Sequence, residues 1–248
     1  MRQVRVWILL CTCLVAIGLC GFTGFNAGVA GVDAALEEQV LQIIRNHPEA
    51  IIESVQVYQQ EQQEATRQAQ AAFSQQMQAN PAAVIGNAPT AGSSQQSIVL
   101  LEFADFQCPY CAKAHDRVKE LLTQYPDITF VYKHFPLVSI HDQAQPSAQA
   151  AWAAQQQGQF WAYYDALYDH QEELGESLYR QLADELGLDL DQFEKDRNSE
   201  EAVVAIANDI TQATSIRLSG TPFFMLNGQV LSPALSPEEV ETALAQVR

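Results

Sequence analysis

The sequence is short of basic residues, and this shortage narrows the range of its partners. Its 248 residues include 13 lysines and arginines against 30 aspartates and glutamates, which gives a formal net charge of −17. A protein that binds a phosphate backbone needs a basic face, so the charge balance argues against nucleic acid as a partner. The apolar fraction of 48% is that of a folded chain, and the length allows a sizeable core in one elaborated domain or two small ones.

Cysteine is also scarce outside the first 20 positions. Of the five cysteines, Cys11, Cys13 and Cys20 fall in an uncharged N-terminal stretch, and only Cys108 and Cys111 lie beyond it. If that stretch is removed on export, the mature chain carries one pair of thiols and no separate structural disulfide.

The N-terminal stretch predicts export. Two arginines precede an apolar run at 6–19, and small residues follow, which is the layout of a signal peptide over residues 1–30. The alternatives are an uncleaved anchor, since about 25 uncharged residues can span a bilayer, and lipid attachment at Cys20. All three place the rest of the protein outside the cytoplasm, in the periplasm or anchored to the membrane facing it.

Residues 33–79 are predicted to form an N-terminal helical extension. Apolar residues keep helical spacing over 33–46, His47-Pro48 breaks the pattern, and a long helix then runs to about Gln78. Its second half has only small and polar residues on the side that would pack. We therefore expect a stalk through which the chain could form a homo-oligomer, with a solvated helix lying on its own domain as the alternative.

A sheet domain is predicted to follow a linker. Residues 80–97 are rich in proline, glycine, serine and threonine, with Val84-Ile85 as a short edge strand. Residues 98–104 are apolar apart from Glu102, as in a central strand covered on both faces. A helix and a second strand at 128–133 complete a βαβ unit, so the two strands should be parallel.

The remainder is predicted to be a helical insertion followed by the return of the sheet. Residues 139–213 have an interrupted helical pattern, and the domain formed by 98–138 resumes at 214–248 with a hairpin at Asn227-Gly228. The aromatic residues of the insertion have the spacing of a buried face, which favours a core over a ligand site. They are Phe160, Trp161, Tyr163, Tyr164 and Tyr168.

The sequence Cys108-Pro109-Tyr110-Cys111 follows the first strand and opens a helix. Two thiols three positions apart at the first turn can close a disulfide, and the free N–H groups and dipole there favour a thiolate. Pro109 suits the first turn, where its missing N–H costs nothing. Cys108 is the expected nucleophile, which requires access from solvent, and Cys111 is the thiol that resolves the mixed disulfide.

Zinc is the main chemical alternative for this pair, because His115 follows one turn later. A structural zinc takes four ligands, and the next histidines, His134 and His141, lie on another segment. Redox chemistry is therefore the preferred interpretation. Four histidines are expected at surface or boundary positions: His47, His134, His141 and His170.

Together these motifs resemble the DsbA-like branch of the thioredoxin superfamily. The resemblance covers about residues 84–248 and rests on four motifs: Glu-Phe-x-x-Phe-x-Cys-Pro-x-Cys, Phe135-Pro-Leu, Gln157-Gly-Gln-Phe-Trp and Ser219-Gly-Thr-Pro-x-Phe. The N-terminal helices with Asn46-His-Pro-Glu look like the extra segment of oligomeric bacterial members. The resemblance implies an α/β, thioredoxin-like fold with a helical insertion and an N-terminal helical extension.

The resemblance also implies roles for individual residues. Pro222 matches the cis-proline that faces the active-site sulfurs, and the Thr221 backbone would pair with an extended substrate segment. Glu102 matches the buried acid beneath the pair, where a desolvated carboxyl has a raised pKa and can exchange a proton with Cys111. An acid reaching solvent is the alternative. No organic cofactor or metal is implied, because the Cys108–Cys111 disulfide carries the two electrons.

The implied activity is thiol–disulfide exchange on cysteines of exported proteins, with an unidentified membrane or soluble redox partner that resets the pair. Tyr110 stands where DsbA-type oxidants have histidine, so a less depressed Cys108 pKa and a weaker oxidant are expected. Oxidase, isomerase and reductase directions all stay open. A non-catalytic, client-binding holdase is the alternative from another class, although it would need neither the intact pair nor Thr221-Pro222.

Overall fold

The computed structural model describes residues 33–248, and the chain divides into two compact units, residues 1–58 and 59–248. The signal peptide or anchor predicted at 1–30 lies outside the described residues. Between residue 33 and the C-terminus, no helix combines the length and the apolar character needed to cross a membrane.

The described part of the first unit contains the first of the two predicted helices and the beginning of the second, which continues into the second unit. Helix α2 (Ala34–Asn46) is capped by Asp33, whose carboxylate accepts from the N–H of Ala35, and helix α3 (Pro48–Ala79) begins after His47. Every residue from 33 to 58 is exposed. The prediction of two helices interrupted at His47-Pro48 is confirmed.

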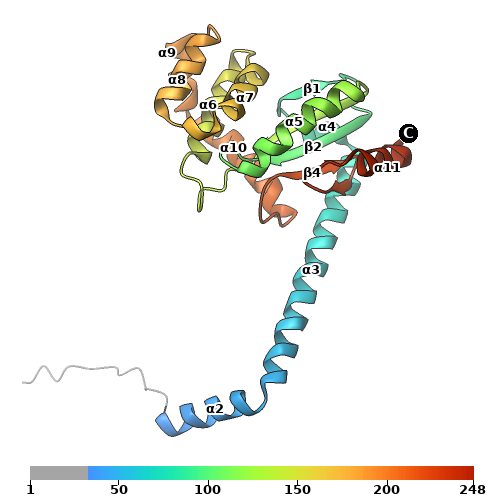
Figure 1. Ribbon diagram of the computed structural model, residues 1–248, viewed down its shortest axis with the longest axis vertical. Helices are drawn as coiled ribbons and strands as arrows, with labels where there is room; N and C mark the ends of the chain where they lie inside the picture. The colour runs from blue at the N-terminus through green and yellow to red at the C-terminus, as the bar shows by residue number, and fades with distance from the viewer. Residues whose placement is uncertain (1–32) are drawn as a thin grey trace, which may run out of the picture. The chain divides into compact units, whose positions relative to one another are not determined.

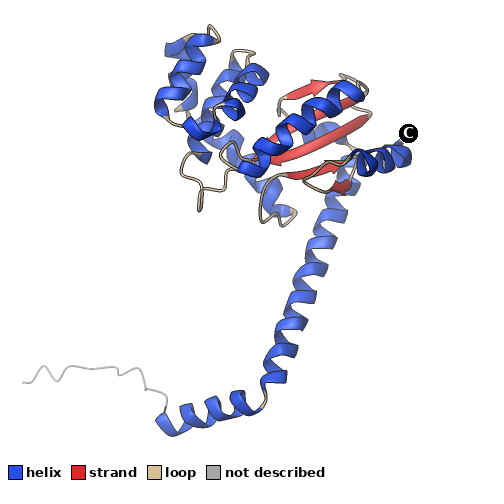
Figure 2. Ribbon diagram, in the orientation of Figure 1, coloured by secondary structure: helices blue, strands red, loops and turns tan. Residues whose placement is uncertain are grey.

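The second unit is built on a five-stranded sheet with the order β1-β3-β2-β4-β5, drawn in red in Figure 2. Strands β2 and β3 are parallel, and the other neighbouring pairs are antiparallel. The parallel pair and the hairpin around Asn227-Gly228 are therefore confirmed. The strands are β1 (Thr90–Gly92), β2 (Ile98–Ala104), β3 (Ile128–His134), β4 (Phe223–Leu226) and β5 (Gln229–Leu231).

Helices cover both faces of this sheet (Figure 1). Alternate side chains of a strand point to opposite faces, so Leu100, Glu102 and Ala104 face one layer of helices while Val99, Leu101 and Phe103 face the other. The first layer comprises α5 (Pro109–Gln124), α7 (Phe160–Asp169) and α11 (Pro237–Val247). The second comprises the end of α3, α4 (Pro81–Ile85) and α10 (Glu200–Ser215).

The segment predicted as a linker is more ordered than expected. Val84 and Ile85 lie in helix α4 and not in an edge strand, because Asn80 caps a helical turn that starts at Pro81. Both side chains are buried against the sheet. The edge strand is β1, whose residue Gly92 lies so close to β3 that an added Cβ would be 2.4 Å from the Ile128 carbonyl oxygen.

The end of α3 also joins the sheet domain. Phe73 and Met77 are buried in the same core as α4, and Gln78 donates to the carbonyl of Asn227 in the hairpin. The last turns of the long helix thus lie on their own domain, as the alternative to the stalk predicted, whereas residues 48–64 of the same helix are exposed.

The insertion is helical, as predicted, and its aromatic residues form part of the core. Phe160, Tyr163, Tyr164 and Tyr168 are buried, and Trp161 packs partly exposed beside them. Besides α7 and α10, the insertion contains α6 (Ala144–Gln156), a 3-10 turn (Gln171–Glu173), α8 (Glu176–Glu185) and α9 (Leu190–Arg197).

One histidine prediction is wrong. His134, expected at a surface or boundary position, is 3% exposed at the end of β3, where its ring packs against Phe106, Tyr132 and Phe160. Burial, together with the neighbouring Lys133 charge, lowers the pKa of His134 to about 3. The side chain is therefore neutral and behaves as a core aromatic residue.

Candidate functional site

The two cysteines lie at the start of α5, directly after the turn that connects this helix to β2. Cys108 is the N-cap residue of α5, and its carbonyl accepts the N–H groups of Cys111 and Ala112. The turn before the helix is held by Asp105, whose carbonyl accepts the N–H of Cys108 and whose carboxylate accepts the N–H of Gln107 at 2.8 Å. Both cysteines are free thiols.

The Thr221–Pro222 loop faces this turn. The peptide bond between Thr221 and Pro222 is cis, as expected, and the Cys108 thiol donates to the Thr221 carbonyl oxygen at 3.4 Å. The sheet brings the two loops together, because β4 pairs with β2 in a register that sets Phe223 opposite Phe103. Two segments more than a hundred residues apart in sequence therefore meet at the end of the sheet where β2 ends and β4 begins.

Access to the thiols is more restricted than expected. Cys108 is 3% exposed and Cys111 is fully buried, so only Cys108 presents any surface to solvent. The Cys108 thiol is therefore less exposed to solvent than its role as nucleophile led us to expect. The Thr221 carbonyl and the side chain of Gln171 both lie against this turn and cover it. Tyr110, between the cysteines, is instead 65% exposed.

The two thiols differ strongly in acidity. Hydrogen bonding by the Cys111 thiol, together with the Thr221 side chain and the backbone N–H groups of α5, lowers the pKa of Cys108 to about 5 despite partial burial. Burial raises the pKa of Cys111 well above its ordinary value, and the hydrogen bond it gives to Cys108 raises it further. Near neutral pH the pair thus consists of one thiolate and one thiol.

Glu102 lies beneath the pair of thiols. Its side chain does not reach solvent, so the predicted alternative of an acid exposed to solvent is wrong. It is 1% exposed, on the sheet face covered by α5, between Tyr132 of β3 and Phe224 of β4. Burial raises its pKa to about 8, and the negative charge of Cys108 contributes. In the described part of the chain, its Oε2 atom has no hydrogen-bond partner.

His115, considered above as a zinc ligand, is engaged elsewhere. Its Nε2 atom lies 2.6 Å from the carboxylate of Asp165 on α7. Over residues 33–248, no three histidine, cysteine, aspartate or glutamate side chains gather in an arrangement that could hold a metal ion.

Several residues of the site have no obvious signal in the sequence. Gln171 donates to the carbonyls of Phe106 and Cys108 at 2.7 and 3.0 Å, which ties the helical insertion to the cysteine turn. His141 lies 2.7 Å from the carboxylate of Asp105 and so connects the loop after β3 to the same turn. Only tertiary structure brings these side chains to the cysteines, although the position of Asp105 just after a buried strand was a hint.

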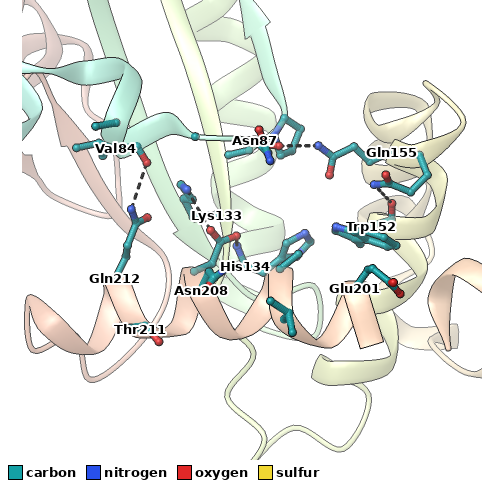
Figure 3. A pocket seen from close by; sticks show the side chains of 18 residues that line it. Val84, Asn87, Lys133, His134, Trp152, Gln155, Glu201, Asn208, Thr211 and Gln212 are labelled. Carbon is teal, nitrogen blue, oxygen red and sulfur yellow. Dashed lines mark hydrogen bonds and ion pairs between the residues drawn. The ribbon is translucent and has the colours of Figure 1, made fainter. Parts of the chain in front are cut away.

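A separate pocket of about 800 Å³ lies between α4, β3, α6 and α10 (Figure 3). Lys133 and Asp209 form an ion pair at 3.1 Å in its wall, and Trp152 and Gln212 also line it. Neither cysteine nor the Thr221–Pro222 loop contributes to its lining. The pocket is thus distinct from the thiol site.

Comparison with known proteins supports the fold. Residues 99–245 match the DSBA-like thioredoxin domain. Among curated proteins, the chain is 40% identical over 138 residues to the Na(+)/H(+) antiporter NhaA 3 of Salinispora tropica, a match that covers 56% of this chain and 21% of the antiporter. The chain spans about a fifth of the length of the curated relatives it matches.

Solved structures agree with this assignment. A thioredoxin-like oxidoreductase from Silicibacter pomeroyi DSS-3 is 28% identical, with a TM-score of 0.58, over 66% of this chain and 93% of that chain. The thiol-disulfide exchange protein α-DsbA2 from Wolbachia pipientis is 16% identical with a TM-score of 0.63, over 72% and 97%. Proteus mirabilis ScsC in a transitional conformation is 19% identical with a TM-score of 0.59, over 87% and 98%. The thioredoxin-like fold with a helical insertion and N-terminal helices is confirmed.

Proposed function

Because this chain belongs to the DSBA-like thioredoxin domain family, we propose that it is a thiol–disulfide oxidoreductase that forms or exchanges disulfides in exported proteins through Cys108 and Cys111. The observation that carries the proposal is the unequal acidity of the two thiols, with a pKa of about 5 for Cys108 and a raised pKa for Cys111. In this arrangement the thiolate can attack a substrate sulfur, while the second thiol stays protonated until the mixed disulfide has formed.

In the reducing direction, the Cys108 thiolate attacks one sulfur of a substrate disulfide. A bond forms between Cys108 and that sulfur, and the other substrate sulfur leaves with the electron pair of the broken bond. Cys111 then loses its proton and attacks Cys108, which closes the Cys108–Cys111 disulfide and releases the substrate as a dithiol. The oxidising direction is the reverse sequence, so no organic cofactor or metal is needed.

Glu102 is proposed as the group that takes the proton from Cys111. The negative charge of Cys108 helps to raise the pKa of Glu102. In the mixed disulfide that charge is gone, so the pKa of Glu102 falls and more of the carboxyl is ionised when the base is needed.

Thr221 and Pro222 are proposed to hold the substrate. The Thr221 carbonyl accepts from the protonated Cys108 thiol, and it becomes free when Cys108 ionises or forms the mixed disulfide. An extended substrate segment can then donate a backbone N–H to it. Pro109 and Tyr110 shape the turn, and Tyr110 offers an exposed aromatic contact beside the thiols.

We further propose that the protein works outside the cytoplasm, in the periplasm or anchored facing it, on cysteine-containing exported proteins. A membrane or soluble redox partner would reset the pair. The similar protein from Wolbachia pipientis is a thiol-disulfide exchange protein, and the apolar run at 6–19 of this chain supports export.

The test compares Cys108→Ser and Cys111→Ser with the unaltered protein in the oxidation of a reduced two-cysteine peptide by glutathione disulfide. Cys108→Ser is expected to lose turnover, whereas Cys111→Ser should accumulate a mixed disulfide detectable by mass spectrometry. Undiminished turnover in Cys108→Ser would overturn the assignment and favour a client-binding role. The reduction potential, expected between about −270 and −120 mV, then distinguishes a reductase from an oxidase.

A further inference from the structure

Three tyrosine hydroxyls are buried near the cysteine pair without a hydrogen-bond partner. Tyr132 lies on β3, and Tyr164 and Tyr168 lie on α7. The three residues are 0%, 3% and 6% exposed, and none of their hydroxyl oxygens has a hydrogen-bond partner among residues 33–248. Buried polar groups are almost always paired, so three unpaired hydroxyls in one place call for a chemical explanation.

These side chains, here called the tyrosine cluster (Tyr132, Tyr164 and Tyr168), lie beside Glu102. Tyr132 is directly opposite Glu102 in the parallel pairing of β2 and β3. The ring of Tyr164 is 5.3 Å from that of Tyr132 and 5.0 Å from that of Tyr168, measured between centroids. All three rings belong to the same core cluster as Cys108 and Cys111.

Glu102 requires hydrogen-bond donors when it is ionised. It is a buried carboxyl with an unpartnered oxygen, and in the proposed reaction it must pass through an ionised state. An ionised carboxylate can only accept hydrogen bonds, whereas each tyrosine hydroxyl can donate one. A donated bond to the charged form stabilises it and lowers the pKa of the acid.

We propose that Tyr132 and Tyr164 are positioning residues for thiol–disulfide exchange: their hydroxyls, with that of Tyr168 behind them, stabilise ionised Glu102 and so set the pH at which it accepts the proton of Cys111. The inference rests on the proposed function and identifies the donors that its buried base requires. After burial, the charge of Glu102 is the next largest cause of the raised pKa of Tyr132 and of Tyr164.

Other ionisable groups surround Glu102 from each packed element. They are Asp105 after β2, Cys108, Cys111 and His115 on α5, His134 beside Tyr132 on β3, and Asp165 beside Tyr164 on α7; β4 contributes only Phe224. Asp105 accepts from His141 and the backbone of Leu137, and Asp165 lies against His115. Within residues 33–248, the ring nitrogens of His134 and the Thr221 hydroxyl are also buried and unpaired. The tyrosine hydroxyls make up the remaining buried donors near Glu102, and Tyr132 lies directly opposite it in the sheet.

The experiment follows the reaction of the reduced protein with 5,5′-dithiobis(2-nitrobenzoate), which reports both steps separately. Cys108 attacks the reagent, forms a mixed disulfide and releases one thionitrobenzoate anion. Cys111 then gives its proton to Glu102 and attacks Cys108, which closes the protein disulfide and releases the second anion. Stopped-flow absorbance is recorded from pH 5 to 10 for the unaltered protein, Tyr132→Phe, Tyr164→Phe and the double variant.

Removal of the tyrosine hydroxyls should slow the second phase, in which Cys111 attacks Cys108. It should leave the rate of the first phase, in which Cys108 attacks the reagent, almost unchanged. A general base contributes about 10²- to 10⁴-fold to a rate, and we expect the double variant to slow the second phase about tenfold at pH 7. The midpoint of its pH profile should move upward by about one unit, because an unsupported carboxylate ionises at higher pH. The first phase is expected to change less than twofold.

Tyr163→Phe is the matched control. Tyr163 is equally buried on the same helix, but its hydroxyl donates to the Tyr179 carbonyl at 2.9 Å, outside the tyrosine cluster. A second-phase profile in the double variant that matches that of Tyr163→Phe would overturn the inference. If the double variant does not fold, the two single variants decide, with about a threefold effect expected in each. Release of only one anion by the unaltered protein would instead contradict the proposed function.

Discussion

The Cys108 sulfur lies 3.4 Å from the backbone carbonyl oxygen of Thr221, 113 residues later in the chain. A protonated thiol can donate to this oxygen, whereas a thiolate cannot. Ionisation of Cys108 therefore activates the nucleophile and frees the acceptor that the substrate backbone needs. Both events follow from the loss of one proton, and the low pKa of Cys108 allows that loss near neutral pH.

The first prediction concerns the origin of that low pKa. Because the hydrogen bond from Cys111 is its main cause, Cys111→Ala should raise the pKa of Cys108 from about 5 toward its ordinary value. The pH dependence of Cys108 alkylation by iodoacetamide measures this directly. Lys113→Gln is the control, since it removes the cation nearest Tyr110 but no bond to the sulfur; an equal midpoint in Cys111→Ala and Lys113→Gln would contradict the assignment.

A second prediction links Glu102 to stability. The native state raises the pKa of Glu102 from 4.5 to about 8, so between these values the folded chain holds a proton that the unfolded chain has lost. Its contribution to stability is present in full below about pH 4.5 and is lost as the pH rises through 8. Relative to Glu102→Gln, the unaltered protein should lose about 2–4 kcal/mol of unfolding free energy over this range.

Urea unfolding of the reduced proteins at pH 5 and pH 8 measures this difference. Glu120→Gln, which alters an exposed acid of α5 paired with Arg117, should show no comparable change with pH. Parallel pH curves for Glu102→Gln and the unaltered protein would mean that Glu102 ionises normally in the native state.

Much of the fold could be predicted because its signals are local. The apolar run at 98–104 predicts a central strand, Asn227-Gly228 predicts a hairpin, and the break at His47-Pro48 ends a helix. Val84-Ile85 was misassigned because two apolar residues fit a strand or a helix equally well. The cap at Asn80 and burial against the sheet decide in favour of the helix.

The site could be predicted only in part, for a related reason. The cysteine pair has a local motif, and the roles of Glu102 and Pro222 came from a resemblance. Gln171 and the tyrosine cluster carry no motif, because their proximity to the cysteines depends on how the insertion packs on the sheet. The sequence identified the aromatic residues of α7 as core, yet their spacing does not indicate which hydroxyls remain unpaired.

A third prediction tests the contact between Gln171 and the cysteine turn. Gln171→Ala removes two hydrogen bonds, each worth about 1 kcal/mol, so the unfolding free energy should fall by about 1–3 kcal/mol. Alkylation of Cys108 at a fixed pH should become faster, because a side chain that rests against a 3%-exposed residue is lost. Gln181→Ala removes an exposed glutamine bonded only to Glu185 and should change neither quantity. A lower stability with unchanged alkylation would show that Gln171 does not limit access.

The last prediction concerns the N-terminal helices. Between residues 34 and 58, the large apolar side chains of these helices are all exposed within the single chain, which is unusual for residues with regular helical spacing and indicates an interaction surface. They are Leu36, Val40, Leu41, Ile43, Ile44, Ile51, Ile52, Val55, Val57 and Tyr58. We predict that these residues join copies of this chain into a homo-oligomer.

Sedimentation velocity over a range of protein concentrations tests the prediction. The unaltered protein should sediment as an oligomer, and the variant Ile43→Glu with Ile52→Glu should sediment as a monomer, because four or more buried carboxylates would have to be desolvated in the assembly. The variant Gln42→Glu with Gln56→Glu adds the same charge to the same two helices at polar positions, so it should remain oligomeric. A monomeric unaltered protein at every concentration would instead leave the exposed apolar surface to another partner.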